Sequence, residues 1–236
     1  MRMTTSCRLV LIAIALVSLC IAEPFTFEEN RGQRDSRIRY TARSGDTSII
    51  VDNESFTVAI GSGTKQESVR IRLGRPAKAE GDQKLASISR YRLTGSSNYM
   101  VSAPHFGAVR FNAVADKADA LLIAAHESLP YRFVIQPGGD PASAQMKFTG
   151  VSKLSLDEDG NLHILLASYE IVQAAPRVFQ TISDDSVPLP AKYLINGDTV
   201  SVQVKHYEKT RELIIQPKLL LTGDYPVGKR IARALR

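Results

Sequence analysis

The feature that most constrains the fold is a hydrophobic pattern of period two, which recurs in short runs along most of the chain. In each run, apolar residues, many of them β-branched or aromatic, alternate with polar ones, and turn-forming residues separate the runs. This pattern is typical of strands that bury one face of an antiparallel sheet. The predicted strands are residues 37–43, 47–52, 55–60, 68–73, 88–93, 108–114, 131–136, 145–150, 153–157, 161–167, 192–196, 200–206 and 211–217.

Two stretches favour helix by their composition. Residues 115–129 are rich in alanine and leucine, which have high helix propensity. They lie between two predicted strands, and we expect a strand there as well, because strand formation depends largely on packing context. The second stretch is the basic C-terminal end, residues 227–236.

Two of the connections read as hairpin turns. Asp159-Gly160-Asn161 and Asn196-Gly197 each lie between alternating apolar runs, and the glycine supplies the positive φ that such a turn requires. Strands joined by tight turns pair antiparallel, so we predict an all-β protein with an antiparallel, β-sandwich-like architecture.

One short motif occurs twice in the chain. Residues 131–137 and 211–217 both read as a strand that ends in Ile-Gln-Pro. The repetition suggests two related β halves that meet near residue 150. The prediction is therefore one domain or two closely packed halves.

Residues 1–22 have the composition of a secretory signal peptide. Arg2 and Arg8 precede an apolar run at residues 9–17, and we expect cleavage after Ala22. The run is shorter than the about 20 apolar residues that a membrane-spanning helix needs, although a retained anchor is the alternative. We therefore expect a protein that is secreted or held in the cell envelope.

Removal of this leader has two consequences for the mature chain, which we divide into a domain at residues 23–222 and a basic tail at residues 223–236. Both cysteines, Cys7 and Cys20, would be lost, which excludes disulfides, thiolate nucleophiles and cysteine metal sites. The net charge would fall from +6 to +4. The export signal and the absence of an aromatic-rich basic motif argue against nucleic-acid binding.

Several stretches of the chain resemble a known family. They are residues 25–45, 96–100, 106–122, 131–164 and 210–221. The most specific positions are Phe27, Glu28, Asn30, Gly32 and Gln33, together with the Pro-Gly-Gly-Asp-Pro corner at residues 137–141. These stretches resemble the N-terminal domain of unknown function of secreted bacterial proteins that carry SBBP-type β-propeller repeats. The resemblance implies no catalytic activity and no cofactor, and no propeller repeat follows residue 221 in this sequence.

Motifs for catalysis or metal binding do not emerge from the sequence. The glycines at residues 138–139 precede a strand rather than a helix, so we predict a structural corner and not a phosphate-binding loop. The acidic loop at residues 157–161 lacks the carboxylate at the last position of a calcium loop and reads as a hairpin. The four histidines are scattered, and no G-x-S-x-G motif occurs. We therefore predict no catalytic, cofactor-binding or metal-binding residues.

Glu28, Asn30 and Gln33 form the most unusual polar cluster, either as a small recognition surface or as groups that cap and bridge the first strand. We expect a non-catalytic module that binds a protein or glycan partner at the cell surface through strand edges and loops. The alternatives are a structural envelope domain and a secreted polysaccharide hydrolase that uses paired carboxylates, such as Asp184 and Asp185. Membrane contact is expected only through the basic tail.

Overall fold

The computed structural model describes residues 25–93, 99–182 and 185–221. The leader predicted at residues 1–22 and the basic tail at residues 223–236 lie outside these ranges. The strands are β1 (Phe27–Glu29), β2 (Tyr40–Ser44), β3 (Thr47–Val51), β4 (Phe56–Ile60), β5 (Glu67–Leu73), β6 (Ala79–Leu93), β7 (Tyr99–Ala115), β8 (Ala118–Ile123), β9 (Ser128–Ile135), β10 (Met146–Thr149), β11 (Lys153–Leu156), β12 (Leu162–Leu165), β13 (Glu170–Ile182), β14 (Asp185–Leu189), β15 (Ala191–Asn196), β16 (Thr199–Val204) and β17 (Leu213–Leu220). Two 3-10 turns, η1 (Gly63–Lys65) and η2 (Pro141–Ser143), complete the set. None of the described residues form a helix suited to crossing a membrane.

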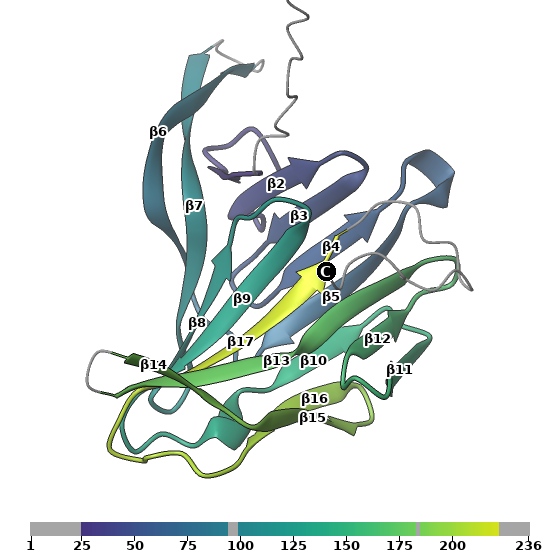
Figure 1. The fold of residues 1–236 in the computed structure, drawn as a ribbon. Coiled ribbons are helices and arrows are strands. Elements are labelled where there is room, and N and C mark those ends of the chain that lie inside the picture. The colour runs from purple at the N-terminus through teal and green to yellow at the C-terminus, as the bar shows by residue number, and fades with distance from the viewer. Residues whose placement is uncertain (1–24, 94–98, 183–184, 222–236) are drawn as a thin grey trace, which may run out of the picture.

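The strands form one antiparallel sheet that folds back on itself (Figure 1). One layer runs β2-β3-β4-β5-β10-β16-β15, and the other contains β7-β8-β9-β17-β13-β12-β11. At one end, the short strand β1 pairs with both β2 and β7 and joins the layers. At the other end, the Tyr193 hydroxyl on β15 donates to the Ala174 carbonyl on β13 over 2.8 Å. The sheet is nearly closed, which confirms the predicted all-β antiparallel class.

The hydrophobic core lies between the layers. The rings of Phe56 on β4 and Tyr131 on β9 have centroids 5.6 Å apart, so the two layers are in direct contact. Strands from before residue 150 form one series of neighbours, and strands from after it continue the sheet at both ends: β16 pairs with β10, and β17 pairs with β9. The two strands with the repeated Ile-Gln-Pro ending, β9 and β17, are antiparallel neighbours.

Most of the local predictions are confirmed. Gly160 and Gly197 have φ angles of +80° and +60°, and each lies in a hairpin, β11–β12 and β15–β16. The alanine-rich stretch at 115–129 forms β8 and the start of β9 rather than a helix. His206 does not continue the strand as predicted, because β16 ends at Val204 and His206 takes a positive φ of 56° in the loop.

The sequence prediction missed β1, β13 and β14, and it found only parts of β6 and β7. In β13, Ala174, Ala175 and Pro176 interrupt the alternation of apolar and polar residues. The register with β17 shifts between Ala174 and Arg177, so a bulge absorbs the proline that cannot donate to the ladder. A strand with such an interruption has no clear period of two.

Candidate functional site

The candidate site lies on the face of the sheet opposite the core, where β3, β2, β1 and β7 are neighbours. Cross-strand pairing places Ile50, Thr41, Glu28 and His105 in one row across these four strands. Successive side chains alternate between the two faces of a strand, so the neighbouring Tyr40 is part of the core. Four positions that are distant in the sequence therefore form one continuous surface.

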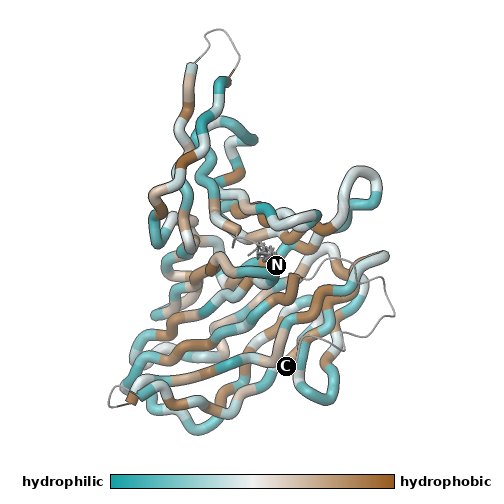
Figure 2. Tube along the Cα trace, turned by 45° about the horizontal axis from the view of Figure 1, so that its top comes forward, coloured by the Kyte–Doolittle hydropathy of each residue, from teal (hydrophilic) through white to brown (hydrophobic). Residues whose placement is uncertain are grey.

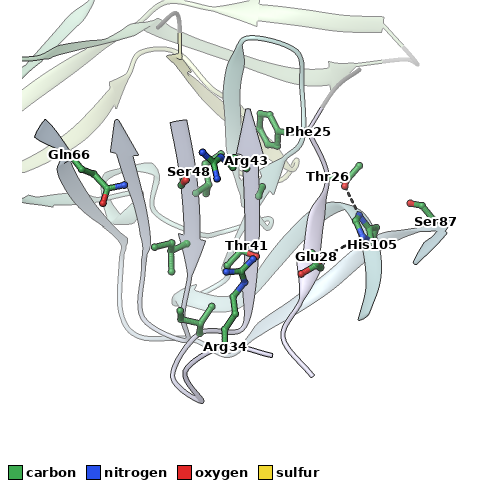
Figure 3. A pocket seen from close by; sticks show the side chains of 14 residues that line it. Phe25, Thr26, Glu28, Arg34, Thr41, Arg43, Ser48, Gln66, Ser87 and His105 are labelled. Atoms are coloured by element: carbon green, nitrogen blue, oxygen red, sulfur yellow. Dashed lines mark hydrogen bonds and ion pairs between the residues drawn. The ribbon is translucent and has the colours of Figure 1, made fainter. Parts of the chain in front are cut away.

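A cleft of about 670 Å³ lies over this surface (Figure 3). The adjacent pair Arg43 and Ser48 on β2 and β3 extends the surface by a second row, because each lies two positions from a member of the first row. Ser87 on β6 and Gln66 before β5 also line the cleft. The lining side chains with hydroxyl or amide groups are Thr26, Thr41, Ser48, Gln66 and Ser87.

Glu28 is the carboxylate of the cleft, and it is held by several donors although it is only 9% exposed. The Tyr91 hydroxyl on β6 lies 2.9 and 2.7 Å from the two carboxylate oxygens. The Gln33 side-chain amide donates to Oε1 over 3.2 Å. Burial acts to raise the pKa of Glu28, but the surrounding Ser89, Tyr91, Gln33 and His105 outweigh it and lower the pKa. The folded protein therefore stabilises Glu28 in its charged form.

His105 is positioned by two hydroxyl groups, one at each ring nitrogen. Its Nδ1 lies 2.7 Å from the Thr26 hydroxyl and its Nε2 lies 2.8 Å from the Ser89 hydroxyl, while Glu28 is 3.7 Å from Nε2. In a serine hydrolase, a carboxylate holds Nδ1 and the serine faces Nε2. Here a hydroxyl takes the place of that carboxylate, and Glu28 lies on the side of the serine. The groups around His105 therefore form a hydrogen-bonded cluster and do not have the arrangement that activates a serine nucleophile.

Two arginines contribute positive charge to the cleft. Arg34 and Arg43 both line it, and Arg43 Nε donates to the Gly45 carbonyl over 3.2 Å. Within the described ranges, neither guanidinium lies within ion-pair distance of a carboxylate. Among the described residues that line the cleft, Glu28 is the one carboxylate. The formal charge of the cleft is therefore positive.

The structure places the three residues predicted as an interaction surface on β1 (Glu28) and in the loop that follows it (Asn30 and Gln33), in different roles. Asn30 organises the loop after β1: its Nδ2 donates to the carbonyls of Asp35 and Ile38 over 2.8 Å, and its Oδ1 accepts from the Gly32 and Arg34 amides. Such contacts are those of a residue that satisfies backbone groups.

Gln33 spans the loop and the cleft, because its amide donates to the Glu29 carbonyl over 2.8 Å as well as to Glu28. Glu28 is the member of the trio that lines the cleft. The two amides therefore shape the loop that carries Arg34 to the cleft, and Glu28 is part of the cleft lining.

The acidic hairpin at residues 157–161 forms a cluster of a different kind. Asp157 accepts from the backbone amides of Asp159 and Asn161, over 3.0 and 2.8 Å, as expected of a turn. His163 bridges two carboxylates, with Nε2 3.1 Å from Asp157 and Nδ1 bonded to Glu170. Nowhere in the described part of the chain do three or more acidic, histidine or cysteine side chains gather as a metal site would require.

The corner at residues 137–141 is built as a backbone reversal. Gly138 has a φ of +76°, and a side chain at Gly139 would come within 2.7 Å of Ile135. Asp140 caps the short turn η2 by accepting from the Ala142 amide over 2.9 Å. The three-residue 3-10 turn η2 therefore lies between the two glycines and β10, which falls within the strand predicted at residues 145–150.

The sequence analysis identified Glu28 but not Thr41, Arg43, Ser48 or His105, which share its surface. The alternation in the second strand places Thr41 and Arg43 on one face, but only the pairing with β1 and β7 brings that face to Glu28 and His105. A search of curated proteins finds no match to this chain. The model of a domain of unknown function, DUF7948, matches residues 27–218, which include β1 to β16 and most of β17. The chain therefore belongs to the DUF7948 family.

Proposed function

We propose that this protein is an exported, non-catalytic binding module of the cell envelope, and that its cleft binds a saccharide that carries a carboxylate. Export is supported by the signal-like composition of residues 1–22 and by the resemblance to domains of secreted SBBP-repeat proteins. The proposal of an acidic ligand rests on Arg34 and Arg43. Both line the cleft, and neither has a carboxylate within ion-pair distance among the described residues.

The chemistry of the cleft matches a polyhydroxylated acid. A guanidinium recognises a carboxylate through two parallel N–H donors, and it holds its charge at all physiological pH values. The hydroxyls of Thr41, Ser48 and Ser87 line the same cleft and both donate and accept, which is what the hydroxyls of a sugar require. A volume of about 670 Å³ lies within the usual range of small-ligand sites, roughly 300–1,000 Å³.

Binding is favoured over hydrolysis by the acidic groups that are present. Glycoside hydrolysis commonly needs two carboxylates that flank the scissile bond. Among the described residues that line the cleft, Glu28 is the one carboxylate, and its pKa is lowered rather than raised, which does not suit a general acid. Of the acidic pair Asp184 and Asp185, the first lies outside the described residues.

The test is titration of the purified mature chain with short oligouronates by calorimetry, with the uncharged oligosaccharide of the same length as the ligand control. We expect binding of the oligouronate and about tenfold or greater weakening in each of Arg34→Gln and Arg43→Gln, since a hydrogen bond to a charged group contributes about 1.5–3 kcal/mol. Arg37→Gln is the matched control, because Arg37 belongs to the same loop but pairs with Asp35. Equal binding of the charged and uncharged ligands, or unchanged affinity in both cleft variants, would refute the proposal.

A further inference from the structure

The hairpin of β6 and β7 extends beyond the body of the protein as a two-stranded arm (Figures 1 and 2). Its outer part pairs in regular register from Ile88 opposite Pro104 to Leu93 opposite Tyr99. Among the described strands, β6 pairs with β7 alone, so its other edge has no neighbour. The arm therefore presents a strand edge of about six residues outside the closed part of the sheet.

The two faces of the arm have different surroundings. On one face, the side chains of Ser89 and Tyr91 contact His105 and Glu28, which line the cleft. The alternate positions, Ile88, Arg90 and Arg92, lie on the opposite face by the period of two. Met100, opposite Arg92, shares that outer face and is 60% exposed, and Ile88 is 45% exposed.

The arm carries positive charge without a counter-charge of its own. Lys84, Arg90 and Arg92 lie on β6, and the sequence between Gln83 and Phe106 contains no aspartate or glutamate. In the part of the chain that the structure describes, none of these three cations forms an ion pair. Two such arms would repel each other, so charge complementarity points to an acidic partner instead of a second copy.

We propose that the outer edge of β6, over residues 88–93, binds an extended acidic segment of another protein as an added strand. Backbone groups of the edge would pair with the segment, and acidic side chains at alternate positions of the segment would lie beside Arg90 and Arg92. An apolar side chain two positions further along would meet Ile88. Arginines on an exposed edge discourage uncharged strands from adding, so the same residues select an acidic one.

The length of the site follows from the irregularity in β6. The register with β7 shifts between Lys84 and Ile88, and Gln83 has a positive φ of 55°. A bulge interrupts the regular spacing of backbone donors and acceptors, which prevents a partner strand from continuing past it. The regular stretch from Ile88 to Leu93 is therefore the part that accepts a strand.

The experiment uses the mature chain and a fluorescent peptide of alternating glutamate and threonine with one leucine near its end, followed by anisotropy. The variant Arg90→Glu/Arg92→Glu tests the charges, and Arg72→Glu on β5 is a control for net charge at an exposed site outside the arm. Two further peptides are N-methylated at alternate residues of opposite parity, since only one parity faces β6 in an added strand. Vesicles of phosphatidylglycerol test the competing possibility of a membrane contact.

We expect the peptide to bind, with at least about tenfold weaker binding in Arg90→Glu/Arg92→Glu and little change in Arg72→Glu. One N-methylated peptide should bind like its parent and the other should lose binding. The proposal is overturned if the peptide does not bind, if both methylated peptides bind equally, or if Arg90→Glu/Arg92→Glu binds as well as the parent protein. If the protein sediments with the vesicles but does not bind the peptide, the arm contacts a membrane surface, and the proposal is overturned as well. A retained urea midpoint in the variants shows that any loss does not come from unfolding.

Discussion

Replacement of Glu28 by glutamine is expected to destabilise the protein, because the residue is a buried carboxylate surrounded by donors. The Tyr91 hydroxyl and the Gln33 amide point hydrogens at it, over distances of 2.7 to 3.2 Å, and its side chain is 11% exposed. A glutamine preserves the shape but removes the charge and turns an NH₂ group toward one of these donors. Hydrogen bonds to a charged group contribute about 1.5–3 kcal/mol each, and the cost of burying the charge offsets part of the total. We expect the free energy of unfolding at pH 7 to fall by about 1.5–3 kcal/mol in Glu28→Gln.

The pH dependence of the free energy of unfolding tests the same prediction, because the pKa of Glu28 fixes its direction. The pKa of Glu28 is lowered from 4.5 in the folded protein, so the stabilising contribution is present above the unfolded-state pKa and is lost as the pH falls through the folded-state pKa. The neighbouring His105 acts in the same direction on the pKa of Glu28. Urea unfolding at pH 7 and pH 3 should therefore show a difference between wild type and Glu28→Gln that shrinks on acidification. A control, Glu54→Gln, removes an exposed partner of Arg70 and should change the stability by less than about 1 kcal/mol. Equal stability of wild type and Glu28→Gln at pH 7, or a difference that grows in acid, would refute the reasoning.

Three further substitutions test other parts of the structure. Tyr131→Phe should lower the free energy of unfolding in urea by about 1–3 kcal/mol, because the carbonyl of buried Gln173 loses the donor that lies 2.5 Å away. Gly74→Ala should lower the free energy of unfolding by about 1–3 kcal/mol, as measured by thermal melts. Gly74 has a φ of +65°, and an added Cβ would overlap the Val114 carbonyl. Burial lowers the pKa of His163, but its two carboxylate partners outweigh burial and raise it above 6.5, so its stabilising contribution is present below that pH and lost as the pH rises through the folded-state pKa. His163→Gln should therefore lose more stability relative to wild type at pH 6 than at pH 9, as measured by urea unfolding.

The fold class was predictable from the sequence because strand alternation and hairpin turns are local signals. Gly160 and Gly197 each provide positive φ between two alternating runs, and both hairpins form as expected. β13 was not predictable in this way, since Pro176 lies within it and the bulge that accommodates the proline depends on pairing with β17. The pairing of strands that are distant in the sequence, such as β10 with β5 and β16, has no local sequence signal.

The candidate site was predictable only in its first residue. Glu28, Asn30 and Gln33 are close in the sequence, and their unusual composition marked them. His105 and Tyr91 become partners of Glu28 because β1 pairs with β7 and β6 lies beside β7. That arrangement is set by long-range pairing, for which a single sequence carries no pattern. The period of two in the second strand places Thr41 and Arg43 on one face, and only the neighbouring strands make part of that face line a cleft.

The two proposed binding surfaces, the cleft and the outer edge of β6 over residues 88–93, share no lining residue, which makes them separable by mutation. Tyr91 connects the inner face of β6 to Glu28, so the position of the arm depends on the carboxylate network of the cleft. Glu28→Gln should therefore weaken binding of the acidic segment, because it releases a contact of the arm. It should not weaken binding of an oligouronate, because it removes the one negative charge among the described residues that line the cleft. Arg90 and Arg92 lie on the outer face and do not line the cleft. Their replacement should abolish binding of the acidic segment and leave the affinity for an oligouronate unchanged, whereas an equal loss of both would mean that cleft and arm form one site.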